Sequence, residues 1–177
     1  MLARKALAGT AGAPKVYVED VFSTYLYTGT GSTQTITNNI DLSGEGGLVW
    51  MKNRSIGYDH ALFDTQRGRA YGLSSNLTDS QTTSSAGQDL SSFNSNGFTV
   101  GTPTYYNSTN RNGDNIVSWT FRKQAKFFDV VTYTGNGTDR TLTSSLGSTP
   151  GCIIVKRTDT TSNWWVYHRG VDATVPQ

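Results

Sequence analysis

The sequence FSTYLYTGTG at residues 22–31 returns as FDVVTYTGNG at residues 128–137, an offset of 106 residues. Further along, GLVWMK at residues 47–52 returns as GCIIVK at 151–156, and DHALF at 59–63 aligns with NWWVY at 163–167. A period this long predicts tandem modules, each a domain of its own, instead of a solenoid of short repeats. No counterpart of residues 72–121 follows the second copy, so we expect a second module that is incomplete here and the leading part of a longer array.

The repeat divides the chain into three parts. Residues 1–15 precede the first copy and have no counterpart in the second, so they are expected to form an N-terminal arm. Residues 16–125 form the first module, and residues 126–177 begin the second, homologous one. The apolar stretch of the arm is shorter than the core of a signal peptide, which favours a flexible or partner-ordered segment.

The composition favours an all-β protein. Ser, Thr, Asn and Gly make up 75 of 177 residues, only 16% of residues are charged, and aromatic residues reach 11%. A net charge of +2 argues against a nucleic-acid partner, and no apolar run approaches the length of a membrane span. Cys152 is the single cysteine, so an intramolecular disulfide is excluded; its apolar strand-like setting predicts a small buried hydrophobe.

Strand patterns recur along the chain, whereas no window shows the apolar spacing of an amphipathic helix. Residues 116–121 alternate small and bulky side chains, so that one face carries Val117, Trp119 and Phe121. Residues 74–92 are expected to form a long surface loop, and Asn96-Gly97 and Asn112-Gly113 to form tight turns. Short strands at this spacing predict a two-sheet antiparallel β-sandwich. The expected strands are 16–18, 22–27, 48–52, 61–64, 98–100 and 116–121.

The sequence offers no convincing catalytic or metal-binding pattern. The two histidines, His60 and His168, do not occupy equivalent positions in the two copies, and Glu19 and Glu45 are the only glutamates. A glycosidase needs two carboxylates facing each other across a cleft, which this distribution does not indicate. Residues 110–115 offer oxygen ligands near a glycine but lack the acidic spacing of a calcium loop, so a hairpin turn is favoured. We therefore expect no enzyme activity, no catalytic residue, no metal and no cofactor.

Two pairs of adjacent aromatic residues are candidates for contact with a glycan or receptor. They are Tyr105-Tyr106, which follows Pro103 in a polar stretch, and Trp164-Trp165. Aromatic rings stack on sugars and anchor protein interfaces. Because neighbours in a strand point to opposite sides, one member of each pair is expected to pack in the core.

An ordered series of motifs resembles a repeat module of phage tail and tail-fibre proteins, especially those of marine cyanobacterial phages. The series consists of GGLVWMKNR at 46–54, LFDTQRG at 62–68, SFNSNGF at 92–98, IVSWTFRK at 116–123 and VTYTGNG at 131–137. The resemblance extends from about residue 17 to the end and implies a jelly-roll or concanavalin-A-like sandwich with a structural or adhesive role. It carries over no catalytic residue.

The resemblance implies a virion tail protein that takes part in host attachment. The arm and the start of the first module would then contact other tail proteins, with Met1, Leu2, Arg4, Lys5, Leu7, Val16 and Tyr17 as candidates. Tail fibres are symmetric oligomers, so a homotrimer or another symmetric assembly is expected. Two alternatives remain: a carbohydrate-binding module that recognises a host-surface glycan, and a polysaccharide-degrading tailspike.

Overall fold

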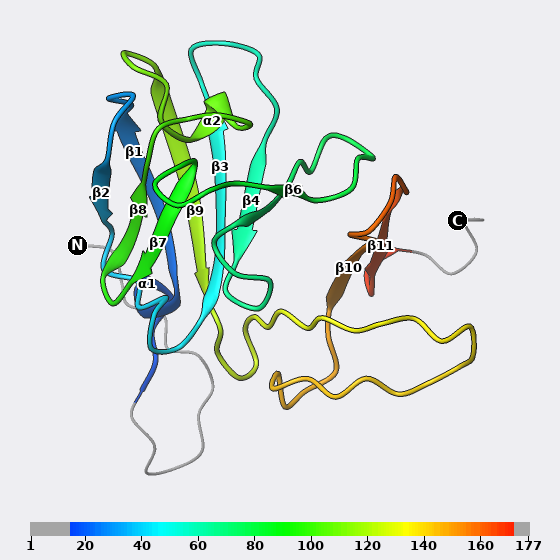
Figure 1. Cartoon of the computed structure of the whole chain (residues 1–177). Helices are drawn as coiled ribbons and strands as arrows, with labels where there is room; N and C mark the ends of the chain where they lie inside the picture. The colour runs from blue at the N-terminus through cyan, green and yellow to red at the C-terminus, as the bar shows by residue number, and fades with distance from the viewer. Residues whose placement is uncertain (1–14, 172–177) are drawn as a thin grey trace.

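The computed structural model describes residues 15–171, whose regular secondary structure is almost entirely β (Figure 1). Within this range the strands form antiparallel sheets of six, three and two strands. The elements in chain order are α1 (Val18–Val21), β1 (Phe22–Thr28), β2 (Gln34–Thr37), β3 (Gly47–Asn53), β4 (Ala61–Asp64), β5 (Tyr71–Leu73), β6 (Thr82–Thr83), β7 (Leu90–Asn94), β8 (Gly97–Val100), α2 (Asn107–Asn110), β9 (Asn115–Arg122), β10 (Cys152–Lys156) and β11 (Trp164–His168).

The two larger sheets pack face to face as an antiparallel sandwich, which confirms the predicted fold class. The six-stranded sheet has the order β1-β9-β3-β4-β5-β6, and the three-stranded sheet has the order β2-β8-β7. Strand β3 shows why the sequence folds this way: Val49 and Met51 are buried, while Leu48 and Trp50 between them are half-buried. This alternation places one side of the strand in the core.

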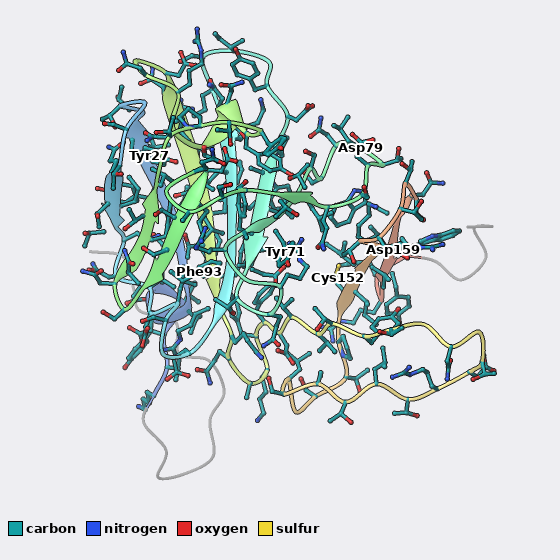
Figure 2. The ribbon with its side chains drawn as sticks, in the orientation of Figure 1. Tyr27, Tyr71, Asp79, Phe93, Cys152 and Asp159 are labelled. Carbon is teal, nitrogen blue, oxygen red and sulfur yellow. The ribbon has the colours of Figure 1, made fainter. Side chains whose placement is uncertain are left out.

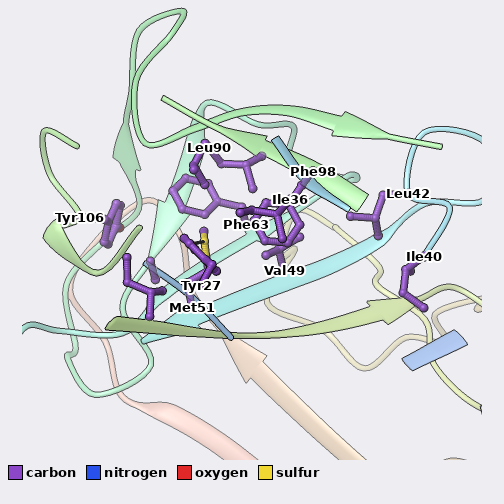
Figure 3. Close-up of a cluster of buried hydrophobic side chains, with 13 residues drawn as sticks. Tyr27, Ile36, Ile40, Leu42, Val49, Met51, Phe63, Leu90, Phe98 and Tyr106 are labelled. Carbon is purple, nitrogen blue, oxygen red and sulfur yellow. Dashed lines mark hydrogen bonds between the residues drawn. The ribbon is translucent and has the colours of Figure 1, made fainter. Parts of the chain in front are cut away.

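Both sheets contribute side chains to one apolar core (Figure 3). Phe63 of β4 packs edge-on against Tyr106, with ring centroids 5.4 Å apart. The buried Tyr27 hydroxyl donates to the Thr109 carbonyl oxygen at 2.5 Å, and burial raises the pKa of this phenol. The other core residues are Ile36, Ile40, Leu42, Val49, Met51, Ala61, Leu90, Phe98, Val100 and Ile116, with Phe93 packed against them.

Most of the expected strands are present, but two local predictions were wrong. The expected strand at 16–18 does not form, because Val18 begins the short helix α1; the Asp20 carboxylate accepts a hydrogen bond from the Tyr17 backbone N–H at 2.8 Å. Residues 74–92 are not one loop, because β6 pairs with β5 and β7 pairs with β8. The polar composition of residues 74–92 hid these strands: β6 has only two residues, and β7 begins at Leu90 with mostly polar side chains.

The bulky face of β9 points away from the three-stranded sheet. Ile116, Ser118 and Thr120 are completely buried on the inner side, whereas Trp119 and Phe121 are half-buried on the other. Of the inner residues, Ser118 and Thr120 are small and leave room for the facing layer. The Asn38 amide donates to the Thr120 hydroxyl across the core at 2.8 Å.

Among its described residues, the second repeat forms a single hairpin, β10–β11. With an offset of 104 residues, its register is that of β3–β4: Val49↔Phe63 corresponds to Ile153↔Tyr167, and Leu48↔Asp64 to Cys152↔His168. Residues 129–150 contain no strand, although they repeat the sequences of β1 and β2. The division into tandem modules at residue 125 therefore stays a prediction.

Cys152 lies on β10 as expected but is exposed, so the prediction of a buried thiol was wrong (Figure 2). The two-stranded sheet that holds Cys152 has no second layer packed on it within the described residues, and an apolar strand pattern without a covering layer does not produce burial.

The connecting segment, residues 124–151 between β9 and β10, is held to the first sandwich by an ion pair that is largely shielded from solvent. Lys123 Nζ lies 3.0 Å from Asp129 Oδ1, and the Asp129 side chain is almost fully buried. The second carboxylate oxygen accepts from the Ser145 backbone N–H at 2.6 Å. Burial raises the pKa of Asp129, but the hydrogen bonds from Lys123 and Ser145 outweigh it, so that the pKa lies below its ordinary value.

Candidate functional site

The Tyr105 loop, residues 102–106 between β8 and α2, is organised by one buried carboxylate. Asp89 has no solvent exposure, and its Oδ1 accepts from the backbone N–H groups of Thr104 at 2.9 Å and Tyr106 at 3.2 Å. Its Oδ2 accepts from the hydroxyls of Ser84 at 2.6 Å and Thr104 at 2.9 Å. Hydrogen bonds to a charged acceptor are about twice as strong as neutral ones. The anchor thus fixes the backbone that carries Tyr105.

The two tyrosines of this loop have opposite environments. Tyr105 is 63% exposed, whereas Tyr106 is 5% exposed and belongs to the core. The Tyr106 hydroxyl lies 2.8 Å from the Thr82 hydroxyl, and burial raises the pKa of the phenol. Of the pair, only Tyr105 offers a ring to a partner.

The two tryptophans of β11 divide in the same way. The Trp164 indole N–H donates to the Leu77 carbonyl oxygen at 2.8 Å, so its ring is half-buried against the first sandwich. Trp165 is 68% exposed. The Tyr105 loop and β11 belong to different repeats, and Figure 1 shows them on separate parts of the structure. Tyr105 and Trp165 are therefore two separate candidate contacts.

An aromatic row on the outer face of the six-stranded sheet was not among the residues proposed from sequence. The Trp50 and Trp119 rings meet edge-on with centroids 5.8 Å apart, and the pair is only half-buried. Phe22 lies 4.9 Å from Phe121, which contacts Phe128 at 5.2 Å. The alternation of Val117, Trp119 and Phe121 signalled such a face, but the pattern alone did not tell which side of β9 is the core.

His60 completes one end of this aromatic row. Its Nδ1 accepts a hydrogen bond from the Trp50 indole N–H at 2.8 Å, which requires that nitrogen to be unprotonated. Burial and the nearby Lys52 lower the pKa of His60, while Asp59 partly opposes them. His168 lies at the end of β11, where its Nδ1 accepts from the Gly170 backbone N–H at 3.1 Å. The two histidines thus serve different local structures.

The polar turn at residues 110–115 uses its side chains for internal hydrogen bonds. Asn110 is fully buried and donates to the Gly101 carbonyl oxygen at 2.9 Å. Asp114 accepts from the Asn53 amide at 2.6 Å and pairs with Arg111 at 3.0 Å. Hydrogen bonds from Asn53 and Arg111 lower the pKa of Asp114. Between residues 15 and 171, no group of three or more His, Cys, Asp or Glu side chains is placed to hold a metal ion.

The attachment candidates Met1, Leu2, Arg4, Lys5 and Leu7 lie outside the described residues. Val16 and Tyr17 lie just before α1 and are both half-buried. No helix in the described part of the chain is long and apolar enough to cross a membrane.

Comparison with known proteins gives a family and no activity. No curated protein and no solved structure matches the chain. One family model, described as a domain of unknown function (DUF7483), matches residues 18–176. This range contains the sandwich, the connecting segment and the β10–β11 hairpin. The chain therefore belongs to the DUF7483 family.

Proposed function

We propose that the chain is a structural and adhesive component of a phage tail, with its N-terminal part attached to the tail and its β-modules leading towards the host. It would act without catalysis, in the virion, as a homotrimer or another symmetric oligomer in contact with other tail proteins. The sequence motifs that resemble tail-fibre modules are the starting point of this proposal.

One structural observation carries the proposal further: the β3–β4 hairpin recurs as β10–β11 in the same register. A fibre grows by reusing a scaffold whose surface residues can change. Here the register is kept while His60 is replaced by Trp164 and Trp50 by Ile154. The second copy keeps the strand pairing of the first but not the side chains around His60, and this supports a structural role.

Attachment is tested by deleting residues 1–15 from the gene in a phage that carries it. The expected result is loss of the protein from purified particles, measured by immunogold labelling and by mass spectrometry of the tails. A deletion protein that folds, as judged by circular dichroism, and still enters particles at the normal level would overturn the role of the arm. Light scattering of the full chain tests the trimer, and a monomer at micromolar concentration would contradict it.

Glycan binding is a second candidate function because Tyr105 and Trp165 expose most of their rings. Such rings can stack on sugar faces. A glycan array probed with the full chain should give signals that fall on Tyr105→Ala or Trp165→Ala. Tyr133→Ala is a matched control, since Tyr133 is an exposed aromatic that was not proposed as a contact. Absence of binding, or an equal loss with the control, counts against this function.

The polysaccharide-degrading alternative has the least support. Its discriminating feature would be a pair of carboxylates facing each other across a cleft, and the distribution of acidic residues in the sequence does not indicate such a pair. Incubation with host capsule and a reducing-sugar assay distinguishes it, because release of reducing ends would replace the structural proposal by an enzymatic one.

A further inference from the structure

The second repeat presents the side chains of a sandwich core without a layer that covers them. Val49 and Phe63 are fully buried, yet their counterparts Ile153 and Tyr167 are 42% and 48% exposed. The same contrast holds for the remaining core positions that recur, namely Tyr27 and Tyr133, Ile36 and Leu142, Met51 and Val155, and Ala61 and Trp165. These positions stay apolar in the second repeat, but nothing among the described residues packs over them.

The first sandwich shows what covers this pattern. Residues 88–122 supply β7, β8, the Tyr105 loop and β9, and five core residues come from them: Leu90, Phe98, Val100, Tyr106 and Ile116. Strand β9 also pairs with the second edge of β3, from Gly47↔Arg122 to Asn53↔Ile116. The matching edge of β10 carries no strand, because β10 and β11 form a sheet of two.

The described residues, 15–171, offer no unpaired segment with this pattern. The sequence of residues 88–122 occurs once, and its β9 is already paired on both edges, with β1 and with β3. The N-terminal residues 1–14 contain one β-branched residue, Thr10, and no aromatic residue, so they lack a strand pattern. The first sandwich therefore indicates which sequence pattern fits this place, namely that of residues 88–122.

We propose that the β10–β11 hairpin is a docking surface for a polypeptide segment with the sequence pattern of residues 88–122, which adds antiparallel to the free edge of β10. An exposed apolar strand with an open edge is a template for strand addition. The hairpin is also held in place for it: besides the Trp164 contact, the Ser162 backbone N–H donates to the Thr78 carbonyl oxygen at 2.8 Å. These contacts hold one end of the hairpin and leave the face with Ile153 and Tyr167 open. This proposal does not depend on the proposed role in a phage tail, because it rests on the structure of the hairpin.

The register of β3 with β9 makes the proposal specific. Leu48 faces Phe121, so Cys152, the counterpart of Leu48, should face the Phe121 position of a docked segment. A synthetic peptide of residues 88–123 with Phe121→Cys is mixed with the full chain in a glutathione redox buffer. Residues directly opposite in a strand pair are close enough for a disulfide. The matched peptide has Thr120→Cys instead, which points the thiol to the other face.

The expected result is a disulfide between Cys152 and the Phe121→Cys peptide in at least about tenfold excess over the Thr120→Cys peptide, because neighbours in a strand face opposite sides. The unsubstituted peptide should also slow the reaction of Cys152 with a thiol reagent. In the chain, Ile153→Asp should abolish both effects, since this position faces the docked layer. Ile154→Asp is the matched control: it places the same charge on the opposite face of β10 and should leave both effects.

Several results would overturn the proposal. They are equal cross-linking of the two peptides, no protection of Cys152 by the unsubstituted peptide, and equal sensitivity to Ile153→Asp and Ile154→Asp. A chain that instead forms a Cys152–Cys152 disulfide dimer and excludes the peptide would show that the free edge pairs with a second copy, which also contradicts it.

Discussion

Removal of the Asp89 carboxylate should destabilise the sandwich and loosen the Tyr105 loop. Asp89→Ala takes the acceptor from three backbone N–H groups, those of Thr104, Tyr105 and Tyr106, and from the hydroxyls of Ser84 and Thr104. Hydroxyls can rotate towards other acceptors, but the three N–H groups are fixed, and the Tyr105 hydrogen bond is the longest of them at 3.4 Å. Each buried donor left without an acceptor costs about 1–3 kcal/mol, so the expected loss is about 3–5 kcal/mol after partial relaxation.

Asp89→Asn is a graded version of the same test. Asparagine keeps one oxygen for the N–H groups, and its amide can donate to the hydroxyls of Ser84 and Thr104 once these rotate. Asparagine also tolerates the positive φ of 42° at this position. The expected cost is about 1–2 kcal/mol, mainly the loss of charge-assisted hydrogen bonds.

The assay is urea unfolding followed by tryptophan fluorescence and fitted for the free energy of unfolding and its urea dependence. The slope should not change, since the same surface is exposed on unfolding. Asp159→Ala is the control because this exposed aspartate pairs only with an exposed Arg157 among the described ion pairs, and it should leave the midpoint unchanged. The reasoning fails if Asp89→Ala costs less than about 1 kcal/mol, or if Asp89→Asn costs as much as Asp89→Ala.

Three further results are expected. The pKa of His60 is lowered in the folded protein, so the neutral imidazole stabilises the fold fully above the ordinary histidine pKa of about 6.5. This stabilisation is lost as the pH falls through the pKa of the folded state. The fluorescence of Trp50 should report this pH dependence, and His60→Gln should remove it. The Asp129 carboxyl should titrate below about pH 3.9, and acid below that value should release the connecting segment, seen in NMR spectra as a shift that Asp129→Asn lacks. Gly101→Ala should cost about 2 kcal/mol or more in urea unfolding, because the new Cβ would overlap the Gly87 carbonyl oxygen; a neutral effect would refute the close approach.

Much of the sandwich could be predicted because its strands carry strong local signals. The apolar runs at 22–27, 48–52, 61–64 and 116–121 all form strands at nearly those residues. The short strands β5 and β6 were not predicted because they have only three and two residues, and Gly72 in the middle of β5 has a weak strand preference. The outer aromatic row was also not predicted. The alternation of side chains in β9 defines two faces, and only the position of the second sheet decides which face is buried.

The candidate contacts were predictable in kind but not in detail. Neighbouring aromatic residues in an extended segment point to opposite sides, so one member of each pair was expected to be packed and the other exposed. Tyr106 and Trp164 are the packed members. Which member packs depends on Phe63 and on the Leu77 carbonyl, both distant in sequence. The Asp89 anchor gave no local signal, because its donors lie 5 and 15–17 residues away.

The two repeats separate what sequence determines from what tertiary structure decides. Sequence alone determines the apolar pattern, the turns and the register of a hairpin, and for that reason β3–β4 and β10–β11 form alike wherever they occur. The patterns of β1 and β2 also recur, at residues 128–134 and 140–143, but they form no strand there. In the first repeat β1 pairs only with β9 and β2 only with β8, and neither partner recurs. A strand needs hydrogen-bond partners along its edge, so local sequence can form a hairpin by itself, whereas a strand whose partner is distant forms only when that partner is present.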